Sequence, residues 1–272
     1  MLAEKFPMKH IFIGGNGSIG QRHIANLRAL QPNAEIVIVD PQGEADYDHT
    51  HHLRSFKDSV VYICTPTITH KRKLIEALNK SAAAIFMEKP LISLQHSTTD
   101  LLRRCDVPFA CGYSYRFHPL FSSLKKNPSN IFFFHLYGTE NITDRYGPTA
   151  LETMLSHSID LALWLFGPAH RRDRLVSKDG MIAIVQLPHR NNVLSFLHAD
   201  MLSPYRVATC TVGYTKDKEE YFDLVNVVPT NEMYLDEMQA WLHFLDTGER
   251  GNLCSYEEAL QVQELMEEAR DS

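Results

Sequence analysis

Three glycines in the segment Gly15-Asn16-Gly17-Ser18-Ile19-Gly20 constrain the fold of this chain more than any other feature. They follow the apolar run Ile11–Ile13 directly and open an amphipathic stretch. In a strand-turn-helix unit of this kind, the first glycine permits the tight turn, the second lets N–H groups approach a pyrophosphate, and the third lets the helix pack closely on the strand. The segment therefore predicts a dinucleotide-binding βαβ unit. The alternative is a glycine-rich turn in an ordinary α/β domain.

Asp40 ends a second apolar run and supplies the acidic group that such a unit requires. A carboxylate at this position can accept hydrogen bonds from both ribose hydroxyls of an adenosine, and it repels the 2'-phosphate of NADP. The helix N-terminus adds positive partial charge beside the pyrophosphate. Asp40 therefore favours NAD over NADP, although by itself it could also cap the turn before Pro41.

Composition limits the class of protein. The 272 residues, 44% of them apolar, suffice for two modest domains or one large domain. A net charge of -6, with lysine and arginine scattered along the chain, argues against a nucleic-acid partner. No apolar run approaches the length of a bilayer span, and residues 1–7 lack the apolar core of a signal peptide. We therefore expect a cytoplasmic protein with no membrane partner.

Neither the cysteines nor the histidine-rich segment predicts a metal site. The five cysteines are odd in number, widely spaced and without a CxxC pair, so they indicate neither a disulfide framework nor a zinc site. Imidazoles and carboxylates that could bind zinc gather in one polar segment, but without ordered ligand spacing. These residues are Asp46, Asp48, His49, His51 and His52.

The first 111 residues alternate between strand and helix patterns. Their apolar strands run through without polar alternation, as a parallel sheet covered on both faces requires. Expected strands cover residues 11–13, 35–39, 60–64, 83–87 and 108–111, and expected helices cover 18–30, about 73–78 and 98–104. We therefore predict an α/β Rossmann domain over residues 1–111.

The pattern changes after Gly112, because several strands follow one another with few helices between them. That order is typical of an antiparallel sheet in an α+β domain, which we place at residues 112–272. Expected strands cover 131–137, 181–187, 193–198 and 206–214, and expected helices begin near Pro119 and cover 151–166, 231–245 and 255–269. In 131–137 both alternating faces are apolar, so we expect a second subunit to cover one of them. Helices of the same chain covering both faces are the alternative.

Two short motifs could carry chemistry. Glu88-Lys89-Pro90 follows a predicted parallel strand, and open α/β sheets place ligand-contacting groups at that end. Lys89 is the candidate base, because a lysine in a partly dry cleft can remove a hydroxyl proton. His157 and Asp160, three residues apart, share one face of an apolar helix and could relay a proton or bind substrate hydroxyls. A surface turn and a structural His-Asp contact are the respective alternatives.

Taken in order, five motifs resemble those of the Gfo/Idh/MocA oxidoreductases. They are Gly15-x-Gly17-x-x-Gly20, Thr65-Pro66 followed by His70, Glu88-Lys89-Pro90, the segment Tyr113-Ser114-Tyr115-Arg116-Phe117-His118-Pro119, and the His157-x-x-Asp160 helix ending in Trp164-Leu165-Phe166-Gly167. The resemblance spans nearly the whole chain. It implies a Rossmann domain joined to an α+β domain with an open-faced, predominantly antiparallel sheet, and assembly into a homodimer or homotetramer through that sheet.

The resemblance also implies roles for residues. Lys89 corresponds to the catalytic lysine and His157 to the catalytic histidine. The substrate side is assigned to Asp160, Tyr113, Arg116 and His118, and Arg116, His118 and Arg145 could also bind a carboxylate or phosphate. The cofactor side is assigned to Gly15, Asn16, Gly17, Ser18, Ile19, Gly20, Asp40, Thr65, Pro66, His70, Glu88 and Lys89.

Two departures from the family pattern stand out. Thr153 occupies the position four residues before His157 where many relatives carry an aspartate, with Glu152 beside it. The segment from Pro41 to Ser59 is also shorter than in relatives, which predicts a more open adenosine side and weaker cofactor binding.

These features predict an NAD-dependent oxidoreductase that transfers a hydride between nicotinamide and a secondary alcohol or ketone of a sugar or nucleotide sugar. An NAD-assisted glycosidase or lyase without net redox change is a second hypothesis. A non-catalytic dinucleotide-binding protein is the third, and the presence of both Lys89 and His157 argues against it.

Overall fold

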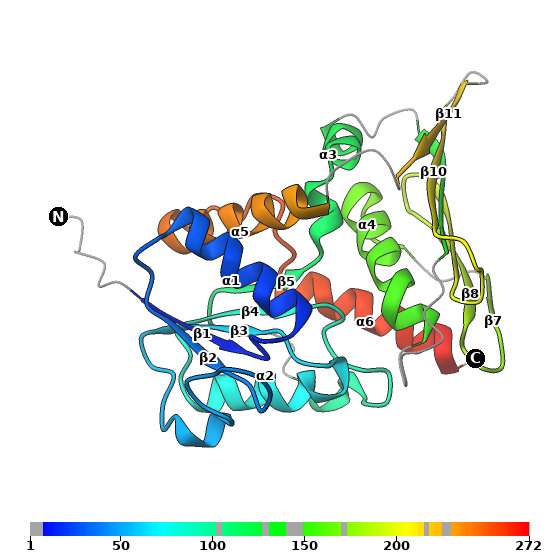
Figure 1. The fold of residues 1–272 in the computed structure, drawn as a ribbon. Helices are drawn as coiled ribbons and strands as arrows, with labels where there is room; N and C mark the ends of the chain where they lie inside the picture. The colour runs from blue at the N-terminus through cyan, green and yellow to red at the C-terminus, as the bar shows by residue number, and fades with distance from the viewer. Residues whose placement is uncertain are drawn as a thin grey trace. The chain divides into compact units, whose positions relative to one another are not determined.

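The computed structural model describes residues 8–101, 105–126, 131–139, 149–169, 173–214, 218–224 and 230–271. Contacts divide the chain into two compact units, Met1–Ser114 with Asn231–Ala259, and Tyr115–Thr230 with Leu260–Ser272 (Figure 1). The end of the first stretch lies three residues beyond the boundary expected at residue 111. Residues 231–259, which we expected in the second domain, return to the first unit.

A five-stranded parallel sheet forms the first unit, as predicted. Its strand order is β2-β1-β3-β4-β5. The strands are β1 (Lys9–Ile13), β2 (Ile36–Val39), β3 (Ser59–Ile63), β4 (Ala84–Glu88) and β5 (Phe109–Gly112). Every residue of β3, β4 and β5 is buried, which explains why these strands show apolar runs instead of alternation.

Helices cover both faces of this sheet. Figure 1 shows α1 (Ser18–Leu30) and α5 (Thr230–Thr247) on one side and α2 (His70–Asn79) on the other. On the α1 and α5 side, the ring of Phe12 stacks on Tyr62 with centroids 4.1 Å apart. Trp241 of α5, fully buried, packs edge-on against Phe86 of β4 at 5.8 Å. The burial of this indole is the physical reason that α5 returns to the first unit.

Short turns complete the first unit. Three 3-10 turns lie at η1 (Thr50–His52), η2 (Thr67–Thr69) and η3 (Thr98–Asp100). Where a helix was expected over 98–104, the structure has only a 3-10 turn at Thr98–Asp100, and Leu101 after it is extended; residues 102–104 lie outside the described part of the chain.

The second unit contains a six-stranded sheet in the order β11-β10-β6-β9-β8-β7. Neighbouring strands in this sheet are antiparallel, except for the parallel pair of β6 and β9. The predicted predominantly antiparallel sheet is therefore confirmed. The strands are β6 (Ile131–Thr139), β7 (Asp173–Val176), β8 (Ile182–Pro188), β9 (Leu194–Asp200), β10 (Val207–Tyr214) and β11 (Lys218–Asp223). The short, largely polar β7 and β11 were not predicted.

Helices of the second unit pack on one face of its sheet. They are α3 (Pro119–Lys126) and α4 (Ser156–Phe166), with the 3-10 turn η4 (Ser114–Phe117) before α3 and a π-helical turn, η5 (Leu151–Leu155), before α4. The ring of Phe134 in β6 packs against Phe166 at 5.3 Å and Phe121 at 6.4 Å. The last helix, α6 (Tyr256–Asp271), begins in the first unit and ends in the second.

The opposite face of the second sheet is only half covered. The rings of Phe133, His135 and Tyr137 in β6 and of Phe196 and His198 in β9 are half-buried there. His135 contacts Phe196 at 5.3 Å, and Tyr137 contacts His198 at 4.7 Å. We call these five side chains the open face. Within the described residues, no helix combines the length and the apolar character needed to cross a membrane.

Candidate functional site

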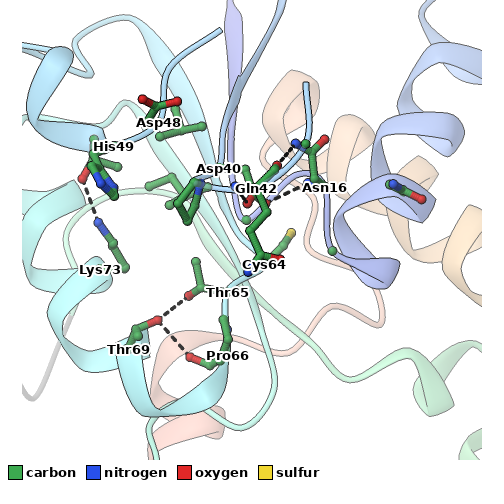
Figure 2. A pocket seen from close by; sticks show the side chains of 18 of the residues that line it. Asn16, Asp40, Gln42, Asp48, His49, Cys64, Thr65, Pro66, Thr69 and Lys73 are labelled. Atoms are coloured by element: carbon green, nitrogen blue, oxygen red, sulfur yellow. Dashed lines mark hydrogen bonds between the residues drawn. The ribbon is translucent and has the colours of Figure 1, made fainter. Parts of the chain in front are cut away.

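A cavity of about 750 Å³ lies in the first unit, where β1, β2 and β3 end (Figure 2). Ligand sites of open α/β sheets lie at this end of the strands. Residues from four segments of the chain line this cavity. They are Ile13, Gly14, Asn16, Gly17 and Gln21; Val39 to Glu44; Asp48, His49 and Thr50; and Cys64, Thr65, Pro66, Thr69, Arg72 and Lys73. The cavity therefore brings together the glycine-rich turn, Asp40 and the Thr65-Pro66 loop, as the sequence predicts.

The glycine-rich turn packs closely against strand β1 and leaves open space at the start of α1. A Cβ on Gly20 would lie 2.4 Å from the carbonyl oxygen of Gly14, so only glycine lets α1 pack this closely. Gly17 caps α1, and a Cβ there would meet nothing closer than 3.4 Å. The space beside Gly17 is therefore open to a ligand. Gly14, which we did not predict, has a φ of +83°, a left-handed conformation that favours glycine.

Gly15, Ser18 and Ile19 belong to the same turn but do not line the cavity. Gly15 is buried, and a Cβ there would meet the Ile38 side chain at 2.9 Å. Ser18 and Ile19 open α1 but are not among the lining residues. The first-turn N–H groups of α1 face no intrahelical acceptor, so this helix end can bind an anion.

Asp40 is buried at the end of β2, and both its oxygens are held by backbone donors. Oδ2 accepts the N–H of Asn16 at 3.0 Å, and Oδ1 accepts the N–H of Gln42 at 2.9 Å. A carboxylate oxygen has two lone pairs, so each can still accept a ligand hydroxyl. The carboxylate is therefore fixed in place with acceptor capacity remaining.

Asn16 fastens the loop after β2 to the glycine-rich turn. Its side-chain amide donates to the carbonyl of Gln42 and, at 3.0 Å, to that of Glu44 (Figure 2). Gly43, with a φ of +73°, lies against the Asn16 side chain. Asn16 thus shapes the cavity wall in addition to lending its backbone N–H to Asp40.

The segment between Pro41 and Ser59 is anchored to α2 and to Lys80 directly after it. Lys73 donates to the Thr50 hydroxyl at 2.7 Å, and Lys80 donates to the carbonyls of Thr50 and Leu53 at 2.6 and 2.9 Å. Glu76 lies 2.9 Å from both lysine ammonium groups. Burial opposes its charged form, but hydrogen bonds from Thr50, Lys73 and Lys80 prevail and lower the pKa of Glu76 to about 2.

The Thr65-Pro66 loop is ordered by side-chain hydrogen bonds. Thr69 Oγ1 donates toward Thr65 Oγ1 at 2.7 Å, and it lies 2.9 Å from the Pro66 carbonyl (Figure 2). His70 does not line the cavity, although we predicted a cofactor contact for it. Its ring is buried, with Nε2 2.9 Å from the Thr65 carbonyl and Nδ1 2.8 Å from the Pro90 carbonyl.

Glu88 and Lys89 lie at the end of β4 in the same unit. Glu88 Oε1 is 2.7 Å from Nε2 of His23 on α1, and both side chains are buried. Glu88 Oε2 accepts the backbone N–H of Lys89 at 3.3 Å. Lys89 is half-buried, and the Lys89-Pro90 peptide is cis. Glu88 therefore bonds the Lys89 backbone, and His23 is a partner that we did not predict.

The second unit holds the other predicted catalytic group. His157 lies in the first turn of α4 and stacks on Tyr115, with centroids 4.8 Å apart. The Tyr115 contact was not predicted, because no sequence spacing relates the two. Glu152 and Thr153 lie in the π-helical turn, and the Glu152 carbonyl accepts the Ser156 hydroxyl at 2.8 Å.

Arg116 and Asp160, both expected on the substrate side, pair with each other. Arg116 Nε lies 2.9 Å from Asp160 Oδ2, and Nη2 lies 2.6 Å from Oδ1. The two side chains are 2% and 0% exposed, and the guanidinium also lies over the Trp164 ring at 5.8 Å. This pair fixes η4 against α4 within the second unit.

The remaining predicted substrate residues are buried. Tyr113, in the first unit, is 1% exposed, and His118, in the second, is 4% exposed. His118 Nδ1 accepts the N–H of Leu120 at 3.2 Å, and burial lowers the pKa of its ring. Arg145 lies outside the described residues. Substrate contact by Tyr113, Arg116, His118 and Asp160 stays a prediction.

The histidine-rich segment lies at the edge of the first unit. The rings of His51 and His52 are 4.1 Å apart, and His49 lines the cavity. Among the described residues, no group of three histidine, cysteine, aspartate or glutamate side chains has the arrangement of a metal site.

Fold and cavity together define the first unit as a dinucleotide-binding Rossmann domain, joined in this chain to an α+β unit. Residues 8–106 match the model of the Gfo/Idh/MocA family, described as an oxidoreductase family with an NAD-binding Rossmann fold. Residues 8–106 therefore correspond to the NAD-binding Rossmann domain of this oxidoreductase family. No curated protein sequence matches it.

Solved structures share the fold over nearly the whole chain. Levoglucosan dehydrogenase in complex with NADH is 16% identical, with 96% of this chain and 95% of that chain covered and a TM-score of 0.78. UDP-N-acetylglucosamine 3-dehydrogenase from Acidithiobacillus ferrooxidans is 16% identical, with 97% and 96% covered and a TM-score of 0.77. For myo-inositol 2-dehydrogenase from Lactobacillus plantarum the corresponding values are 16%, 98%, 97% and 0.77. At these identities the likeness is one of fold.

Proposed function

We propose that this oxidoreductase uses NAD to interconvert a secondary alcohol and a ketone on a sugar or nucleotide sugar. The observation that carries the proposal is the cavity of the first unit, because both the open space at Gly17 and the buried Asp40 carboxylate line it. The three structural relatives described above are dehydrogenases of a sugar, a nucleotide sugar or a cyclitol, which supports the substrate class.

The lining residues fit NAD. The backbone at Asn16 and Gly17 would hold the pyrophosphate, and Asp40 would accept hydrogen bonds from the adenosine ribose hydroxyls. In NADP a 2'-phosphate takes the place of one hydroxyl, and the Asp40 carboxylate would repel it. Thr65 and Pro66 would contact the nicotinamide half. Bound NAD supplies a hydride acceptor in the oxidative direction and, once reduced, a donor in the other.

Lys89 is the proposed base. Its Nζ would take the hydroxyl proton as the C–H hydrogen leaves with its electron pair, so that the alcohol carbon becomes a carbonyl. Glu88 holds the Lys89 backbone through its N–H. His157 would pass the proton onward, and Tyr115 fixes the plane of its ring. The Arg116-Asp160 pair would hold neighbouring hydroxyls or an anionic group of the substrate.

We further propose a homodimer or homotetramer built through the open face of the second sheet. Three aromatic rings and two imidazoles lie half-buried there, and an antiparallel sheet with one solvated face would carry polar side chains instead. The proposed compartment is the cytoplasm.

Lys89→Ala tests the assignment. The protein is screened with NAD and a panel of sugars, cyclitols and nucleotide sugars, and reduced nicotinamide is followed by absorbance. We expect the variant to lose turnover and to retain NAD affinity, whereas Lys57→Ala, an exposed matched control, should keep both. Unchanged turnover in Lys89→Ala would remove the base. Product formation without net reduced nicotinamide would instead favour an NAD-assisted glycosidase or lyase.

A further inference from the structure

One imidazole joins two loops of the first unit. His70, the first residue of α2, is 1% exposed. Its Nε2 is 2.9 Å from the carbonyl oxygen of Thr65, a residue that lines the dinucleotide cavity. Its Nδ1 is 2.8 Å from the carbonyl oxygen of Pro90, the residue after Lys89. A displacement of either loop therefore acts directly on the same buried ring.

Lys89 is held from its other side by a second buried group. Its N–H donates to Glu88, whose carboxylate is bonded to His23 of α1. The Lys89 backbone is thus fixed on one side by the Glu88 carboxylate. On the other side, its position depends on the contact between His70 Nδ1 and the Pro90 carbonyl oxygen. The Glu88 side is bonded to α1, whereas the His70 side is bonded to the Thr65 loop that lines the cavity.

The chemistry of imidazole makes the two His70 contacts unequal. A neutral ring has a single N–H, so between two carbonyl oxygens it donates to one and turns a lone pair toward the other. The doubly protonated ring could satisfy both. Burial lowers the pKa of His70, and the Lys89 charge acts in the same direction, against the carbonyls of Pro90 and Thr65 and the charge of Glu88. The neutral form therefore prevails near neutral pH.

We propose that His70 is a positioning residue that couples the dinucleotide cavity to Lys89 by donating its ring proton to the Thr65 carbonyl or to the Pro90 carbonyl. A dinucleotide that draws the Thr65 loop toward itself shifts the proton to Nδ1, which fixes Pro90 and with it Lys89. This coupling rests on the proposed function, because only that function makes Lys89 the base of the reaction.

Two substitutions separate the two contacts. The amide nitrogen of asparagine reaches the position of Nδ1, so His70→Asn keeps a donor for Pro90 and loses the one for Thr65. The amide nitrogen of glutamine reaches the position of Nε2, so His70→Gln keeps the donor for Thr65 alone. His10→Asn is the matched control, because His10 is a buried histidine of the same unit whose Nδ1 bonds Tyr62 instead.

Hydrogen exchange with and without saturating NAD gives a readout that needs no substrate. In the unmodified protein and in His10→Asn, NAD should slow exchange both at residues 13–20 and at residues 88–92, by about fivefold or more at each. In both His70 variants the effect at 13–20 should remain, and the effect at 88–92 should fall below about twofold. Exchange in β3 reports whether each variant is folded.

The outcomes separate the two proposals. Equal slowing at 88–92 in the unmodified protein and in both His70 variants would overturn the coupling, because NAD would then act on the Lys89 loop directly. Slowing at 13–20 without slowing at 88–92 in the unmodified protein would also overturn the coupling and leave the NAD site standing. No slowing at either segment in the unmodified protein would overturn both.

Discussion

The ring of His23 and the carboxylate of Glu88 meet at 2.7 Å between Nε2 and Oε1, and they join the helix after the glycine-rich turn to the residue before Lys89. The two side chains are 0% and 10% exposed. One contact thus links the proposed pyrophosphate cradle to the proposed base.

Removing His23 should destabilise the protein. In His23→Ala the Glu88 carboxylate stays buried with the loss of a donor, which costs about 1–3 kcal/mol of unfolding free energy. Urea denaturation measures the change, and the exposed His51→Ala is the control. When His23→Ala is introduced into the Glu88→Gln variant, the loss of unfolding free energy should be smaller, because no carboxylate is then left without its partner. Equal costs in both backgrounds would show that the two groups do not interact.

Changing Asp40 should change the choice of cofactor. Asp40→Ser removes the negative charge that opposes a 2'-phosphate, and it replaces the charged acceptor for the ribose hydroxyls with a shorter, neutral hydroxyl. We expect the dissociation constant for NAD to rise about tenfold and that for NADP to fall, by loss of one charge-assisted bond and relief of one repulsion. Titration calorimetry measures both. Glu35→Gln, just before the same strand β2, should change neither, and an unaltered NAD:NADP ratio in Asp40→Ser would contradict the assignment.

Stability should fall in mild acid because of His10. This ring is 4% exposed and bonded to Tyr62 Oη at 3.0 Å, and burial lowers its pKa from 6.5 to about 4. A lowered folded-state pKa means that the unfolded chain binds the proton more readily. The contribution of His10 is therefore complete above pH 6.5 and is lost as the pH falls toward 4, by at most about 3 kcal/mol.

Urea unfolding of the unmodified protein and of His10→Gln between these pH values isolates that contribution. The variant should lose less stability on acidification, because the remaining buried histidines titrate equally in both proteins. A pH dependence identical in the two would contradict a neutral, buried His10.

A charge on the open face should disrupt the proposed oligomer. Phe196 is half-buried there and contacts His135 at 5.3 Å. Phe196→Glu would place a carboxylate inside the subunit contact, where desolvation is unfavourable. Light scattering after size exclusion should give the monomer mass for this variant. Tyr221→Glu, on β11 at 67% exposure, should keep the mass of the unmodified protein. A monomer in every case would contradict the oligomer.

Periodic patterns predicted the two sheets well. The apolar runs through β3 and β4 and the helix over 18–30 were identified because burial on both faces and the glycine turn leave clear patterns. The placement of α5 was wrong, because the side chains that bury Trp241 belong to strands far away in the sequence. The polar edge strands β7 and β11 carry no apolar alternation, so they gave no signal.

Residue motifs located the cavity but not its internal bonds. Asp40 was predicted from its position at a strand end, and Thr65 and Pro66 were predicted from the family resemblance. All three line the cavity. The partnership of His23 with Glu88 could not be predicted, since 65 residues separate them and a buried histidine on a helix carries no distinctive pattern. Asp160 was singled out from its place on an apolar helix and Arg116 from the family resemblance, but only coordinates show that they pair with each other.

NAD binding by Gly17→Val tests the central claim, that the glycine-rich turn and Asp40 form a dinucleotide cavity, most directly. A Cβ at Gly17 meets nothing closer than 3.4 Å, and the φ of -67° suits any residue, so the variant should fold. Its side chain would fill the space beside the helix N-terminus that the pyrophosphate requires. Calorimetry should show saturable NAD binding to the unmodified protein and none to the variant at the same thermal stability. Equal NAD affinity in the two proteins, or no binding to either, would contradict the account.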